Sequence, residues 1–141
     1  MNISRFAIAV ACSACIFLVA ISQTQSKARS VLFTASDGVS KQTFKVRLSN
    51  AADIKHARDI LAHTVNDHMG IMGTVVLGDG GYNSPWHFHL TDPSFFSRVE
   101  ENCDAKLADI ERFARDGKLP GSIHNVWCPW SSHLVEEVAN K

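Results

Sequence analysis

The sequence has no excess of charge of either sign. Its 141 residues include 14 lysines and arginines and 14 aspartates and glutamates, so the formal net charge is +0. Proteins that bind nucleic acid neutralise the phosphate backbone with clustered basic side chains. The composition therefore argues against a nucleic-acid partner.

Long apolar runs are also absent, with one exception at the start of the chain. Residues 6–21 are apolar or small, carry no charge and follow Arg5. The run is shorter than the roughly 20 residues that a membrane-spanning helix needs. We interpret residues 1–22 as a secretory signal peptide cleaved after Ser22, with cleavage after Ala28 or an uncleaved membrane anchor as alternatives. We therefore expect a monomeric protein, extracellular or periplasmic, that leaves the membrane once the signal is removed.

Cysteine is scarce, and its positions are informative. Of the four cysteines, Cys12 and Cys15 lie inside the predicted signal peptide, where lipid modification is an alternative role. The other two, Cys103 and Cys128, form an even pair in an exported chain, which predicts a disulfide. Two free thiols or a metal-binding pair are the alternatives.

Alternating apolar residues predict the first part of the fold. Apolar side chains occupy every second position of Thr43–Leu48, which is typical of a half-buried strand. Residues 31–35 are also β-prone and precede the turn signal Ser36-Asp37-Gly38. These features predict a β-hairpin with its tip between residues 37 and 42.

Capping signals predict three helices. Asn50, with Asp53 in the first turn, predicts a helix that ends near residue 62. The Asp92-Pro93 pair predicts a long helix that continues to residue 116 and carries Cys103 on its buried face. A serine cap at Ser131 or Ser132 predicts a short helix over residues 132–138.

Two further strands complete the predicted fold. Residues 71–77 are rich in β-branched side chains, with Gly73 as the position of a bulge, and residues 86–90 alternate. The fold class is therefore α+β, with a small antiparallel sheet of about four strands packed against two main helices and one disulfide. Residues 23–43 form the lead-in and first strand, and residues 44–138 form the remaining domain. The predicted core includes five aromatic residues: Phe44, Trp86, Phe88, Trp127 and Trp130.

Two histidines, His87 and His89, share the outer face of the strand over residues 86–90. With His124 or His133 as a third ligand, they are candidates for a metal site, and so for a metal-dependent enzyme. No carboxylate accompanies them at a matching spacing. We therefore expect solvent-facing histidines, no metal or other cofactor, and no catalytic residues.

Several short motifs occur in a characteristic order along residues 44–135. They include Tyr82-Asn83-x-x-Trp86-x-Phe88-His89-Leu90, Cys103-Asp104-Ala105, Leu119-Pro120-Gly121 and Trp127-Cys128-Pro129-Trp130-Ser131-Ser132. In these motifs the chain resembles the N-terminal domain of the slime-mould calmodulin-binding protein and its small exported bacterial relatives. The resemblance implies a single small domain and, by the family name, calmodulin binding. It supplies no catalytic residues.

The residues between the second predicted helix and Cys128 suggest a function. The loop over residues 117–126 is fixed at both ends, by Gly117 and by the predicted disulfide, which lowers the entropic cost of binding. We predict a non-catalytic binding module whose partner is an extracellular protein or glycan, with protease inhibition as one alternative. Calmodulin binding is less favoured because the predicted second helix is net acidic, whereas calmodulin targets are typically basic. The predicted binding residues are Leu119, Pro120, Ser122, Ile123, His124 and Asn125.

Overall fold

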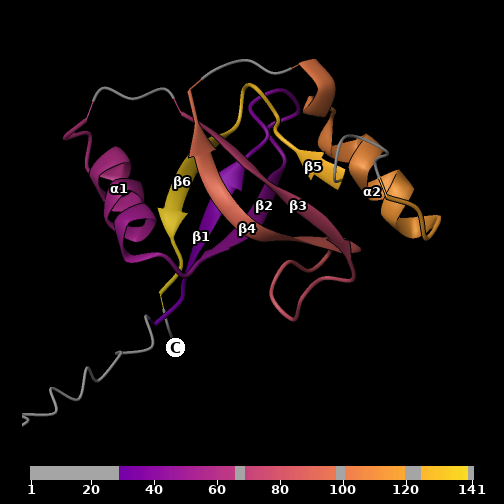
Figure 1. The fold of residues 1–141 in the computed structure, drawn as a ribbon, viewed down its shortest axis with the longest axis horizontal. Helices are drawn as coiled ribbons and strands as arrows, with labels where there is room; N and C mark the ends of the chain where they lie inside the picture. The colour runs from indigo at the N-terminus through magenta and orange to yellow at the C-terminus, as the bar shows by residue number, and fades with distance from the viewer. Residues whose placement is uncertain (1–28, 66–68, 98–100, 120–124, 140–141) are drawn as a thin grey trace, which may run out of the picture.

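The structure is a computed structural model that describes residues 29–65, 69–97, 101–119 and 125–139 (Figure 1). The predicted signal peptide, with Cys12 and Cys15, lies outside the described residues. Among the residues described, no helix is long and apolar enough to cross a membrane. The elements follow the order β1 (Val31–Ser36), β2 (Thr43–Leu48), α1 (Ala51–Leu61), β3 (Gly70–Leu77), β4 (Phe88–Phe96), the 3-10 helix η1 (Glu101–Cys103), α2 (Leu107–Arg115), β5 (Val126–Trp127) and β6 (His133–Glu137).

The first sheet has the strand order β2-β1-β6 and is antiparallel. β1 and β2 form the predicted hairpin, with Phe33 opposite Val46 and Ala35 opposite Phe44 on the buried face. The Asp37 amide donates to the Gln42 carbonyl over 3.0 Å and closes the tip. The hairpin prediction is confirmed, because period-two alternation and turn residues act locally.

The second sheet has the strand order β4-β3-β5. β3 and β4 pair along most of their length, with a register shift between Met72 and Thr74 that marks a bulge opposite Gly73. The α+β class is confirmed, and so is the bulge. The strands are divided between two three-stranded sheets instead of forming one sheet of about four.

The first helix forms as its capping residues predict. The Asn50 side chain accepts a hydrogen bond from the Ala52 amide over 2.8 Å, and Asp53 lies in the first turn. Ile54 and Ala57 are its buried residues. In Figure 1, α1 lies beside β6, with its axis roughly along that strand.

The predicted helix start at Asp92-Pro93 is wrong. Asp92 has a φ of 48°, and both residues lie within β4 where two residues stand opposite Gly73 alone. Proline lacks an amide hydrogen, and a bulge is one of the few places in a sheet that tolerates this loss. The chain stays extended to Phe96, which pairs with Gly70, and the helix begins only at Leu107.

The predicted helix over residues 132–138 is also wrong. Residues 133–137 form β6, which pairs with β1 and buries Leu134. A serine that can cap a helix can equally end a turn before a strand. The open edge of β1, formed almost 100 residues earlier in the chain, decides between the two.

One hydrophobic core joins the sheets and both helices. Trp127 is fully buried, and its ring lies 4.9 Å from Phe44 and 5.6 Å from Phe88 between ring centroids. Leu107 and Ile110 bring α2 onto the same core. Trp86 is only partly buried, and its Nε1 donates to the Thr43 carbonyl over 2.8 Å.

Candidate functional site

Trp130 is exposed and not part of the core, contrary to our prediction. Its exposed fraction is 39%, whereas Trp127, three residues earlier, is completely buried. The two tryptophans lie on opposite sides of a chain reversal between β5 and β6. We call residues 128–132 the anchored turn, for reasons that follow.

A disulfide holds the first residue of the anchored turn. Cys128 is bonded to Cys103, as predicted, and its amide donates to the Cys103 carbonyl over 2.9 Å. The two cysteines are 25 residues apart, and closing a loop of that length is worth about 3–4 kcal/mol on the chain-entropy model. The turn is therefore joined covalently to the segment before α2.

A buried serine holds the last residue of the anchored turn. The Ser132 hydroxyl donates to the Pro129 carbonyl over 2.6 Å and accepts from the Ile71 amide over 2.9 Å. Ser132 thus closes the turn and ties it to the start of β3. The helix-capping role that we predicted for the serines of this segment is wrong.

Two further contacts support the middle of the turn. A Cβ atom on Gly38 would lie 1.9 Å from the Ser131 carbonyl oxygen, so only glycine lets the β1–β2 turn approach this closely. Gly38 also has a φ of 72°, which favours glycine. The Trp130 amide donates to the Asp104 carboxylate over 3.3 Å.

Trp130 stands between two hollows of the surface. The larger is a groove of about 520 Å³ between the end of α1 and the start of β6, which we call the α1–β6 groove. The smaller, about 160 Å³, lies against Asp104 and Val39, and Val39 is 66% exposed. Tryptophan is enriched among residues that dominate binding energy, and apolar surface on both sides of it is typical of a contact site.

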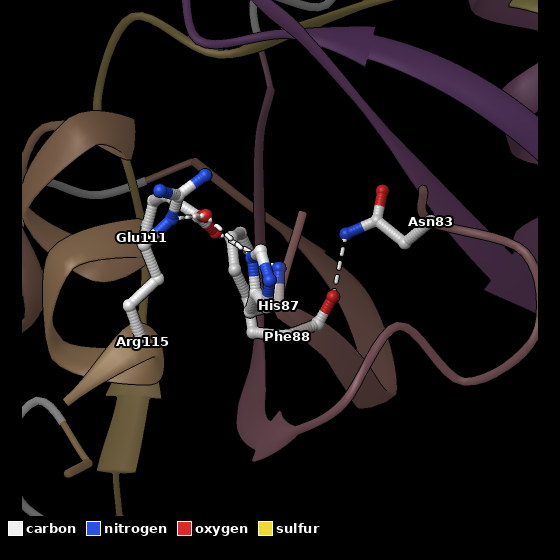
Figure 2. Close-up of polar contacts among 5 residues, drawn as sticks. All are labelled: Asn83, His87, Phe88, Glu111 and Arg115. Atoms are coloured by element: carbon white, nitrogen blue, oxygen red, sulfur yellow. Dashed lines mark hydrogen bonds and ion pairs between the residues drawn. The ribbon is translucent and has the colours of Figure 1, made fainter. Parts of the chain in front are cut away.

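A second group of polar side chains connects α2 with the start of β4 (Figure 2). Glu111 accepts hydrogen bonds from the His87 amide over 2.8 Å, from His87 Nδ1 over 2.7 Å and from Arg115 Nε over 2.6 Å. Burial by itself would raise the pKa of Glu111. The hydrogen bonds from His87 and Arg115 outweigh that effect, so the pKa of Glu111 lies below its ordinary value.

Asn83 holds the other side of this region. It is buried, its Nδ2 donates to the Phe88 carbonyl over 2.8 Å, and its Oδ1 accepts from the Lys45 amide over 2.7 Å. Asn83 therefore bridges the two sheets where β4 begins. Figure 2 shows the Asn83 amide and the Glu111 carboxylate on opposite sides of the 87–88 segment.

His87 and His89 face outward from β4, but they do not converge. His87 Nδ1 contacts Glu111, whereas His89 Nδ1 lies 2.7 Å from the Gly78 carbonyl oxygen. Within the described residues, no group of three histidine, cysteine or acidic side chains could hold a metal ion. The group around Glu111 acts as a structural clamp that fixes α2 against β4.

A model of the calmodulin-binding protein N-terminal domain family matches residues 28–141. The chain belongs to this family. The resemblance seen in the sequence motifs is thereby confirmed over nearly the whole chain after the predicted signal peptide. No curated protein and no solved structure matches the chain.

The binding loop that we predicted for this member of the calmodulin-binding protein family is described only at its ends. Leu119 is 39% exposed, and Asn125 is partly buried with a φ of 57°. Pro120, Ser122, Ile123 and His124 lie outside the described residues. The loop hypothesis is therefore untested, and the anchored turn takes its place as the candidate site.

Sequence reasoning identified the residues of the anchored turn but not their roles. The Cys128-Pro129 pair was a signal for a chain reversal, and a reversal between two tryptophans allows only one of them to face the core. Gly38 was recognised as a turn residue of the hairpin. Its contact with Ser131 joins segments more than 90 positions apart, and no local pattern carries that information.

Proposed function

We propose that this domain is an exported, non-catalytic binding module that recognises a polypeptide partner at the surface around Trp130. The observation that carries the proposal is an exposed indole on a turn held by a disulfide, a buried serine and a glycine contact. A turn fixed in advance loses little conformational entropy on binding. The disulfide is compatible with export, since disulfides persist in oxidising compartments.

Other features favour binding over catalysis. Glu111, His87 and Arg115 are bonded to one another, so their polar groups already serve the fold. The helices also argue against the calmodulin alternative that the family name suggests. α1 and α2 each carry two acidic and two basic side chains, so neither is the basic amphipathic helix that calmodulin typically binds. The acidic excess that we predicted for the second helix came from residues that lie outside α2.

The test is a selection for ligands followed by a matched pair of variants. Purified protein is screened against a phage-displayed library of random linear peptides and against a glycan array. Selected peptides should bind Trp130→Ala at least about 30-fold more weakly, because a central tryptophan is typically worth 2 kcal/mol or more. Leu77→Ala is the control, since Leu77 on β3 is 41% exposed, close to the 39% of Trp130.

Two results would contradict the proposal. One is a set of peptides that binds Trp130→Ala and the unmodified protein equally well. The other is binding to glycans alone, which would place the ligand in a different chemical class.

A further inference from the structure

The α1–β6 groove borders the edge of a sheet. We infer that the partner of this domain binds there as an extended segment, added as a further strand along β6. This inference rests on the proposed function and specifies how the polypeptide is recognised. Trp130 would then contact the added strand at the end of the groove where β6 begins.

The backbone of β6 supplies the first argument. β6 is an outer strand of the β2-β1-β6 sheet, so about half of its amide and carbonyl groups point away from β1. Three consecutive residues of β6, His133, Leu134 and Val135, line the groove. Successive side chains of a strand point to opposite faces. A hollow lined by three in a row therefore runs along the edge of the strand and not over one face.

The opposite wall of the groove supplies the second argument. Ile60 and Leu61 at the end of α1 face the groove together with Met69, so the wall is apolar. The volume of about 520 Å³ falls within the range of about 300–1,000 Å³ that is usual for ligand sites. Strand addition uses these two components, main-chain hydrogen bonds for affinity and pockets for alternate side chains.

The size of the edge favours a peptide over a second copy of this chain. β6 has five residues and spans about 17 Å, whereas a stable interface buries about 800 Å² on each partner. β6 also carries a register shift opposite Thr34 and Ala35, and such bulges disfavour pairing between two long edges. With α1 as one wall, the groove admits one chain but not the folded sheet of another molecule.

Charge narrows the partner further. The groove is lined by the imidazoles of His63 and His133 but by no carboxylate, lysine or arginine. Glu137, farther along β6, already accepts two hydrogen bonds of 2.8 Å from Arg58. The groove therefore suits a segment whose apolar side chains alternate with uncharged or acidic ones, and it offers no partner to a basic segment.

The experiment uses a peptide from the random linear library that binds in a Trp130-dependent way. Each of its amides is N-methylated in turn, which removes one main-chain donor at a time. Strand addition predicts a loss of about tenfold or more at every second position and little change between them. In the unmodified protein, amide hydrogen exchange measured by NMR should slow at residues 133–135 when the peptide binds. The exposed amides of the Gly80-Gly81 turn serve as the control region.

The outcomes separate this inference from the proposed function. If Trp130-dependent peptides bind but N-methylation has no alternating effect and exchange in β6 is unchanged, strand addition is wrong and the binding function stands. If no peptide depends on Trp130, the proposed function fails and strand addition fails with it. A concentration-dependent dimer in analytical ultracentrifugation that the peptide cannot dissociate would assign the edge to a second copy and overturn the inference.

Discussion

The anchored turn and the Glu111 clamp differ in where their side chains point. In the turn, hydrogen bonds and the disulfide hold a large apolar side chain toward solvent. In the clamp, three polar side chains are directed at one another, and Glu111 is only 8% exposed. The residues with the most reactive chemistry thus support the fold, while an indole expected in the core is on the surface.

This contrast has a physical basis. A buried carboxylate is costly unless hydrogen-bond donors surround it, and the donors of His87 and Arg115 meet that requirement. An exposed tryptophan gives up the stability that its burial would provide. The contacts that hold it are formed by its neighbours, so its own removal should cost the fold little.

The two tryptophans of the anchored segment provide the strongest test of the contrast. Trp127→Ala should lower the free energy of unfolding by about 3–5 kcal/mol, because the ring is fully buried between Phe44 and Phe88. Trp130→Ala should lower it by less than about 1 kcal/mol. Urea unfolding of both variants measures the difference. Equal losses would mean that Trp130 is a core residue and that the contrast is wrong.

Two glycine substitutions test how the turn is supported. Gly117→Ala, with a φ of 68° and open space around the position, should cost only the backbone strain of about 1–2 kcal/mol. Gly38→Ala has the same strain and also a Cβ 1.9 Å from the Ser131 oxygen, which adds about 1–3 kcal/mol. The difference between the two unfolding free energies isolates the contact. It vanishes if the β1–β2 turn does not hold Ser131.

Acid titration tests the clamp. Glu111→Gln should lower the unfolding free energy at pH 7 by about 1–3 kcal/mol, through the loss of charged hydrogen bonds. Because the pKa of Glu111 is lower in the folded state, its contribution is complete above the unfolded pKa of about 4.3 and is lost as the pH falls through the folded pKa.

The same titration supplies its own control. The unfolding free energies of Glu111→Gln and the unmodified protein should converge below about pH 4, while their difference stays constant from about pH 5 to pH 7. Glu137 also has a lowered pKa beside Arg58, but it is present in both proteins and cancels in the difference. A gap that persists unchanged into acid would show that the carboxylate charge is not what stabilises the clamp.

Local patterns predicted the elements whose determinants lie close together in sequence. The hairpin needs only alternation and a turn, and α1 needs only Asn50, Asp53 and an apolar stripe. The misassigned segments, 92–96 and 133–137, carried equally good helix signals. Their strands form because partners elsewhere, β3 and β1, have open edges that satisfy backbone hydrogen bonds.

The sequence by itself determined the family, the α+β class and the pairing of Cys103 with Cys128, because motif order, periodicity and an even cysteine count are properties of the chain. Only the tertiary structure decided which tryptophan is buried, what Glu111 and Ser132 bind, and where a groove forms. Each of these depends on contacts between residues 24 to more than 90 positions apart. Such contacts are fixed by how the sheets and helices pack together, which the pattern within any one segment does not encode.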